Sequence, residues 1–105
     1  MKSHSEIRAY FNDIVARELP EIKHDGLRSW ISERLTEPYP AKLSLDPEGT
    51  QIEDFWIVTD HKNGKHYRIA YSTVDDTFGI VTPLKTGIEW YMGNYGTFKK
   101  AVEGM

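Results

Sequence analysis

The chain has no cysteine among its 105 residues. Disulfide bonds, thiolate nucleophiles and cysteine-bound zinc are therefore excluded, and the composition suits a reducing compartment. Long apolar runs are absent as well. No segment approaches the ~18 apolar residues of a membrane span, and the opening MKSHSEIRAY lacks the apolar core of a signal peptide. We expect a soluble, cytoplasmic protein.

An excess of positive charge is also lacking, since 13 lysine and arginine residues face 16 acidic residues and the formal charge is −3. Nucleic-acid binding draws most of its affinity from phosphate neutralisation, so we do not expect a nucleic-acid partner. What the chain does have, 39% hydrophobic and 12% aromatic residues, is typical of a packed globular protein. The expectation is a single domain spanning residues 1–105.

The motifs of the common enzyme classes are missing. There is no G-x-S-x-G nucleophile turn, no H-E-x-x-H zinc pair, and no phosphate loop of the G-x-x-x-x-G-K-[ST] or G-x-G-x-x-G type. We therefore expect no cofactor. Whether the chain is an enzyme stays open, with a non-enzymatic protein favoured.

Two amphipathic helices are expected in the N-terminal third. Apolar residues recur at the 3.6-residue spacing of a helix over residues 7–15, and Ser3 followed by Glu6 forms a capping-box pattern. Pro20 ends this helix or opens a short turn that leads to the next, and a second helix begins after Asp25. The apolar face of the second helix contains Leu27, Trp30, Ile31 and Leu35. The two prolines of the following EPYPAK segment then stop it.

Short strands separated by turn signals follow. We expect them at residues 42–45, 53–60, 65–74, 76–83 and 88–92, and a short C-terminal helix capped by Thr97 or Asn94. Because a parallel pair needs a crossover of about a dozen residues, the short connections make neighbouring strands antiparallel. The sequence therefore predicts an α+β domain, with two N-terminal helices packed on a four- to five-stranded antiparallel meander sheet.

The turns predict which strand residues share a face. Asn63-Gly64 is the strongest two-residue hairpin signal and pairs Trp56 with Tyr71, and a similar turn at Asp75-Asp76 pairs Tyr71 with Ile80. One face is apolar and is assigned to the core beneath the helices: Trp56, Val58, Tyr67, Ile69, Tyr71, Phe78 and Ile80. The other is half polar and contains Thr59, His61, His66, Arg68, Ser72 and Gly79 among Phe55, Ile57, Ala70 and Val81.

The last strand is expected to bury Ile88, Trp90 and Met92 on one side. Its Tyr91 then points outward, and residues 93–96 turn the chain into the terminal helix. The half-polar face and this segment together make the candidate binding surface, whose members are His61, His66, Arg68, Ser72, Tyr91, Asn94 and Tyr95.

His61 and His66 face each other in this register, with Cβ atoms about 4.5–5.5 Å apart. Zinc sites use three or four protein ligands and no third ligand follows in the sequence, so we expect no metal. The same hairpin tip carries Lys62, Lys65 and Arg68, which form either a solvated turn or an anion contact. Acidic residues gather in turns at the other end of the sheet and would orient a charged partner: Glu48, Glu53, Asp54, Asp75 and Asp76.

These features favour a small non-enzymatic protein-interaction domain of inhibitor, immunity-protein or adaptor character, with another protein as its partner. The alternative is a small-molecule-binding or catalytic domain, with a pocket between the face bearing His66, Arg68 and Ser72 and the C-terminal helix. A structural or assembly subunit is a third possibility. A pocket of ~300 Å³ or more that holds His66 or Arg68 would favour ligand binding, and a flat face would favour a protein partner.

Overall fold

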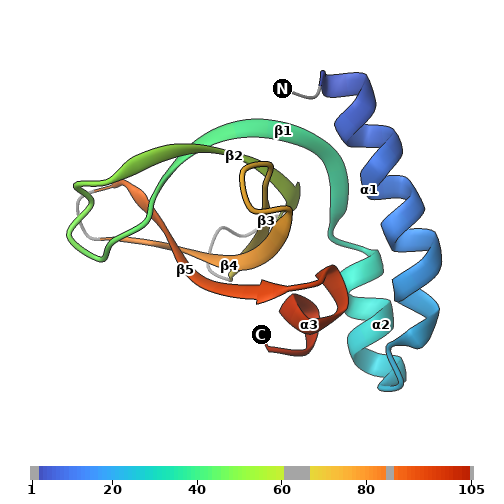
Figure 1. Cartoon of the computed structure of the whole chain (residues 1–105). Helices are drawn as coiled ribbons and strands as arrows, with labels where there is room; N and C mark the ends of the chain where they lie inside the picture. The colour runs from blue at the N-terminus through green and yellow to red at the C-terminus, as the bar shows by residue number, and fades with distance from the viewer. Residues whose placement is uncertain (1–2, 61–66, 85–86, 105) are drawn as a thin grey trace.

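The computed structural model describes residues 3–60, 67–84 and 87–104. The elements of this part of the chain are α1 (His4–Glu18), the 3-10 turn η1 (Leu19–Glu21), α2 (Asp25–Ser32), β1 (Leu35–Ser44), β2 (Ile52–Thr59), β3 (Arg68–Ser72), β4 (Thr77–Pro83), β5 (Glu89–Gly96) and α3 (Phe98–Glu103) (Figure 1). The five strands belong to one sheet, which confirms the predicted α+β class.

The sheet closes into a barrel with the strand order β1-β2-β3-β4-β5, so the prediction of an open meander is wrong. Consecutive strands are antiparallel, and β5 returns to β1 through a parallel bridge between Trp90 and Ser44. Irregularities bend the strands towards closure. The register shifts between Leu35 and Tyr39 in β1 and at two places along the β4–β5 ladder, and such bulges increase the twist and curvature of a sheet.

The helix ends follow from local chemistry. Ser3 caps α1 and exchanges capping-box hydrogen bonds with Glu6, as the sequence predicts. The N-cap of α2 is His24, and not Asp25 as the sequence predicted. The His24 Nδ1 accepts a hydrogen bond from the Leu27 N–H at 3.0 Å. Thr97 caps α3, and its side chain accepts a hydrogen bond from the Lys100 N–H.

The prolines of EPYPAK do not separate the helices from the first strand, because both lie inside β1. The φ angle of proline suits an extended strand, and its missing N–H is tolerated where a ladder is irregular. The register shift before Tyr39 is such a place. Since α2 ends at Ser32, Leu35 belongs to β1 and not to the helix face predicted for it.

The predicted strand register is correct for the β2–β3 pair and wrong for the β3–β4 pair. The pairing of Trp56 with Tyr71 between β2 and β3 is confirmed. Between β3 and β4, Tyr71 pairs with Phe78 instead of Ile80, because four residues, and not two, separate the paired Ser72 and Thr77. A slip of two residues preserves the side on which each side chain points, so the predicted faces of β3 and β4 survive this error.

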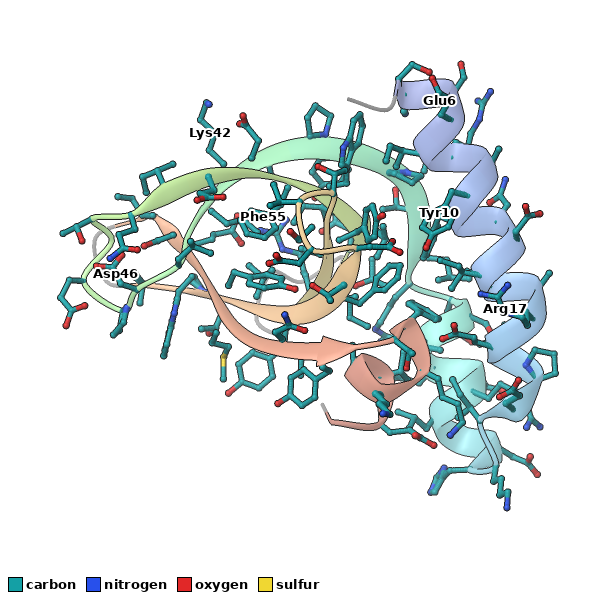
Figure 2. The ribbon with its side chains drawn as sticks, in the orientation of Figure 1. Glu6, Tyr10, Arg17, Lys42, Asp46 and Phe55 are labelled. Carbon is teal, nitrogen blue, oxygen red and sulfur yellow. The ribbon has the colours of Figure 1, made fainter. Side chains whose placement is uncertain are left out.

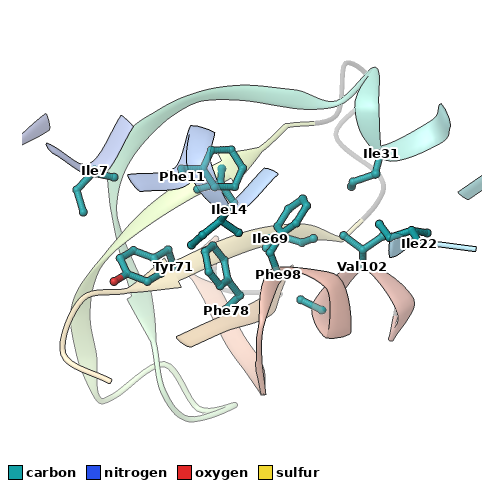
Figure 3. Packing of buried hydrophobic residues seen from close by; sticks show 12 residues of the cluster. Ile7, Phe11, Ile14, Ile22, Ile31, Ile69, Tyr71, Phe78, Phe98 and Val102 are labelled. Atoms are coloured by element: carbon teal, nitrogen blue, oxygen red, sulfur yellow. The ribbon is translucent and has the colours of Figure 1, made fainter. Parts of the chain in front are cut away.

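The helices pack on the outer face of the barrel and form what we call the outer core. Phe11 from α1 and Phe98 from α3 meet edge to face with ring centroids 5.4 Å apart, and both rings contact Phe78 of β4. Figure 3 shows these rings together with the isoleucines that surround them. The buried members are Ile7, Phe11, Ile14, Ile22, Ile31, Val58, Ile69, Tyr71, Phe78, Phe98, Ala101 and Val102. Tyr67, expected in this core, is instead 45% exposed.

The half-polar face of the predicted sheet forms the barrel interior, so it is not the open surface that the sequence suggested. Its apolar members gather into a second cluster, the inner core, with Leu43, Phe55, Ile57, Ala70, Val81 and Tyr91 buried. Figure 2 shows Phe55 between the strands of the barrel. Because α3 packs on the outer face, the pocket expected between this face and the C-terminal helix is not formed by the described residues.

Strand β5 is longer than predicted and faces the other way. It continues to Gly96, so Gly93 and Asn94 are strand residues and not a turn. Tyr91 lies inside the barrel, 8% exposed, with its ring stacked on Phe55 at a centroid distance of 4.5 Å. The Tyr91 ring covers Gly79 so closely that a Cβ there would lie 2.4 Å from its Cζ atom. The absence of a side chain at position 79 is what admits the tyrosine.

Candidate functional site

The outer side of β5 carries exposed apolar side chains, where the sequence predicted burial. Met92 is 38% exposed, Ile88 is exposed, and Trp90 between them is half-buried. The ring of Tyr95, also exposed, lies across Gly93, since a Cβ at position 93 would lie 2.7 Å from the Tyr95 Cε2 atom. The result is a row of large apolar groups along one strand.

The β1–β2 hairpin extends this row sideways. Ile52 pairs with Ser44, and Ser44 in turn pairs with Trp90, so Ile52 lies on the same side of the sheet as Trp90 with only the small Ser44 of β1 between them. The turn between β1 and β2 also lies against β5, because a Cβ on Gly49 would lie 3.4 Å from the Ile88 Cδ1 atom. We call the combined surface the β5 face; it consists of Ile52, Ile88, Trp90, Met92 and Tyr95.

Carboxylates border the β5 face on the hairpin side, at Asp46, Glu48, Glu53 and Asp54. Hydrogen bonds from the Ser44 and Thr50 hydroxyls hold the pKa of Asp46 well below its usual range, so this group is charged at neutral pH. Lys42 pairs with Asp54 across the hairpin at 2.9 Å. Figure 2 shows Lys42 and Asp46 at the end of the barrel away from α1.

Arg68 and Ser72, two of the predicted site residues, occupy the barrel interior and already have partners. The Arg68 guanidinium is ion-paired with Glu89 and donates a hydrogen bond to the Tyr39 hydroxyl at 2.8 Å, leaving the side chain 18% exposed. Ser72 is buried, and its Oγ accepts a hydrogen bond from the Asp75 N–H. The two lie four positions apart on β3, which is roughly 13 Å along the strand, so their backbone positions do not bring them to one substrate atom.

Of the other predicted site residues, one is buried, two are exposed and two are not described. Tyr91 was expected to point outward and is buried, so that expectation is wrong. Asn94 and Tyr95 are exposed, and the Asn94 Oδ1 accepts a hydrogen bond from the Gly96 N–H. His61 and His66 lie outside the described residues.

Sequence reasoning missed the apolar members of the β5 face. In β5 the set Ile88, Trp90 and Met92 is more apolar than the alternating set Glu89 and Tyr91, so alternation favoured burial of the wrong set. Gly79 on the neighbouring strand β4 was an available signal, because a glycine in a strand often marks a close approach by a neighbouring group.

A cavity of about 360 Å³ lies between α1 and the start of β1. Its walls are Arg8, Phe11, Asn12, Val15, Leu35, Thr36, Glu37 and Pro38. Arg8 pairs with Glu37 at 2.9 Å and links the helix to the strand. Arg68 is not among the walls, so this cavity does not satisfy the condition that the sequence set for a ligand pocket.

A cluster of three polar side chains links the β3–β4 turn to α1. Asp76, whose φ of 54° is left-handed, accepts hydrogen bonds at its Oδ1 from the Tyr10 hydroxyl at 2.7 Å and the Tyr71 hydroxyl at 2.5 Å. Burial, and then the bond to Asp76, raises the pKa of Tyr71 and that of Tyr10. The cluster fastens the fold and shows no free group for chemistry.

Comparison with protein-family models, with curated proteins and with solved structures gives no match for this chain. Over residues 3–60, 67–84 and 87–104, no three His, Asp or Glu side chains are grouped as a metal site would need. None of the described helices has the length and apolar character needed to cross a membrane.

Proposed function

We propose that the chain is a non-enzymatic protein-interaction domain and that the β5 face is its contact surface. The carrying observation is the exposure of Ile52, Ile88, Met92 and Tyr95 around the half-buried Trp90. A contiguous apolar patch with polar neighbours is typical of an interaction site, whereas scattered single apolar residues are ordinary. Aromatic residues and methionine are the types enriched at the centres of protein interfaces.

The scaffold beneath this surface supports the proposal. β5 pairs with β4 from Glu89 to Gly96, and on its inner side Tyr91 packs on Phe55 and over Gly79. A strand held from two directions presents its outer side chains in a fixed arrangement. Little conformational entropy is then lost when a partner binds, which favours affinity.

The engagement of the buried polar groups argues against catalysis. Arg68 is held by Glu89 and Tyr39, Ser72 lies at the other end of β3, and the Asp76 carboxylate is bound by two tyrosines. A catalytic site needs a nucleophile or base directed at a substrate position, together with groups that stabilise charge there. The described residues do not bring such groups together.

The cavity between α1 and β1 favours a second candidate function, the binding of a small molecule. Its volume of about 360 Å³ falls within the range of ligand pockets, roughly 300–1,000 Å³. A bulky substitution of the half-buried Val15 would fill it, and Val15→Trp therefore separates the two functions without changing the β5 face.

Affinity capture from the native source tests the proposal, with Met92→Asp and Ile88→Asp compared against wild type. We expect each substitution to abolish capture of the partner, because a carboxylate placed in an apolar contact loses its hydration without gaining a counter-charge. Val74→Asp is the matched control, since Val74 is 77% exposed on the β3–β4 turn, outside the β5 face. Circular dichroism and thermal unfolding verify that each variant is folded.

Two results would contradict the proposal. If the Val74→Asp chain loses the same proteins as the β5 variants, the effect is not specific to the β5 face. If capture survives both β5 substitutions but is lost in Val15→Trp, the α1–β1 cavity is the binding site and the second function is favoured.

A further inference from the structure

Resting on the proposed function, we propose that the partner contributes a basic polypeptide segment to the β5 face, in which lysine or arginine side chains flank apolar anchors. The apolar row of the β5 face receives the anchors. The carboxylates of the adjoining β1–β2 hairpin, Glu48 foremost, receive the cations.

The two segments that contain the members of the β5 face, residues 43–54 and 87–96, carry only negative charges. Residues 43–54 contain four carboxylates and no lysine, arginine or histidine. Glu89 is the only charged residue in the sequence from 87 to 96, and the Arg68 guanidinium already neutralises its charge. Lys42 compensates Asp54, which leaves three carboxylates of this hairpin without a cationic partner on it.

Glu48 lies next to the apolar side chains, since it precedes Gly49, the residue whose Cβ position is 3.4 Å from Ile88 Cδ1. Glu53 follows Ile52 along β2 but pairs with Leu43, so it points to the other side of the strand and contributes charge rather than contact. Both glutamates are exposed. Asp46 adds charge more than contact, because its oxygens accept hydrogen bonds from Ser44, Thr50 and Gln51 within its own turn.

In such an arrangement the apolar row provides affinity, and the acidic border determines which partners are preferred. Burial of the apolar row supplies binding energy to any apolar partner, while the acidic border accelerates the approach of a cationic partner and disfavours an anionic one. A second copy of the chain is a poorer occupant. A two-fold contact uses the same patch on both subunits, so two acidic borders would enter one interface.

Fluorescence anisotropy with three labelled peptides of equal length tests the inference: alternating Lys-Leu, Ser-Leu and Glu-Leu sequences. We expect the Lys-Leu peptide to bind wild type at least ~10-fold more tightly than the Ser-Leu peptide, the Glu-Leu peptide to bind more weakly still, and added salt to narrow the differences. The double substitution Glu48→Lys and Glu53→Lys should remove the preference for Lys-Leu. The control double substitution Asp13→Lys and Glu21→Lys makes the same charge change at exposed helical positions and should preserve it.

The outcomes distinguish this inference from the function on which it rests. Equal binding of the Lys-Leu and Ser-Leu peptides, with both lost in Met92→Asp, overturns the basic partner and leaves the β5 face in place. Binding that is indifferent to Met92→Asp overturns the surface itself. Equal loss of preference in both double variants means that net charge alone acts, which also overturns the inference. Sedimentation that shows self-association abolished by Met92→Asp makes a second copy the occupant.

Discussion

The outer core and the inner core use the same residue types under different constraints. The outer core lies between helices and strands, and its Tyr71 reaches Asp76 with its hydroxyl. The inner core is enclosed by strands alone, and its Tyr91 hydroxyl and the neighbouring Thr77 Oγ1 are buried without a well-formed hydrogen bond to any described residue. Closure therefore gives dense packing but limits the satisfaction of polar groups, whereas a layer with an open edge can admit a charged turn.

The largest effect should come from adding a single methyl group inside the barrel. In Gly79→Ala the new Cβ would lie 1.9 Å from the Gly93 carbonyl oxygen and 2.4 Å from Tyr91 Cζ, so β4 and β5 must separate. We expect the free energy of unfolding, measured in urea, to fall by about 3 kcal/mol or more.

Gly26→Ala is the matched control for that substitution. Position 26 lies in the first turn of α2, its nearest neighbours are side-chain atoms of His24, and the added methyl favours the helix. The free energy of unfolding should change by less than ~1 kcal/mol. Similar losses in the two variants would show that Gly79 is not the point at which the interior is most closely packed.

An intermediate effect is expected in the outer core from Tyr71→Phe. Losing the hydroxyl removes a hydrogen bond to the Asp76 carboxylate, which should lower the free energy of unfolding by about 1.5–3 kcal/mol. The Tyr71 pKa is raised in the folded chain, so this contribution is complete below pH ~10 and declines as pH rises through the folded pKa.

Alkaline unfolding curves measure that dependence. Above pH ~10 the unfolded chain releases tyrosine protons that the folded chain retains, and stability falls by about 1.4 kcal/mol per pH unit for each such tyrosine. Tyr71→Phe should therefore show a shallower decline than wild type. An unchanged slope would mean that the Tyr71 hydroxyl titrates in the folded chain as it does in the unfolded one.

The smallest effect is expected from the same chemical change in the inner core. Tyr91→Phe removes a buried hydroxyl that makes no well-formed hydrogen bond with the described residues, so the free energy of unfolding should stay within ~0.5 kcal/mol of wild type or rise. Burial raises the pKa of Tyr91, and the variant should also lose less stability at alkaline pH. A loss comparable to that of Tyr71→Phe would erase the contrast between the two cores.

Predictions from the sequence succeeded where the structure depends on interactions between residues close together in the chain. Trp56, Val58, Ile69, Tyr71 and Phe78 were assigned to one face from turns and alternation, and the structure buries or half-buries all five there. The error at the β3–β4 turn did no harm because a two-residue slip keeps each side chain on its side.

The candidate site was predicted less well. Of its described members, Asn94 and Tyr95 are exposed as expected, while Tyr91 is buried, Ser72 is buried, and Arg68 is held by Glu89 and Tyr39. The half-polar face looked open because an isolated strand pair does not reveal whether another strand will cover it. Its polar residues are those near the ends of β3, where a barrel interior meets solvent or a turn.

The sequence by itself determined the helices, the antiparallel neighbours, the first hairpin register and the outer apolar face. These depend on capping residues, turn residues and periodicity, all of which act over a few positions. The tertiary structure alone decided that Ser44 would meet Trp90, that the barrel would close and that Tyr91 would turn inward over Gly79. Those outcomes depend on contacts between distant segments and on bulges that reverse the side of a strand, and a local pattern contains neither.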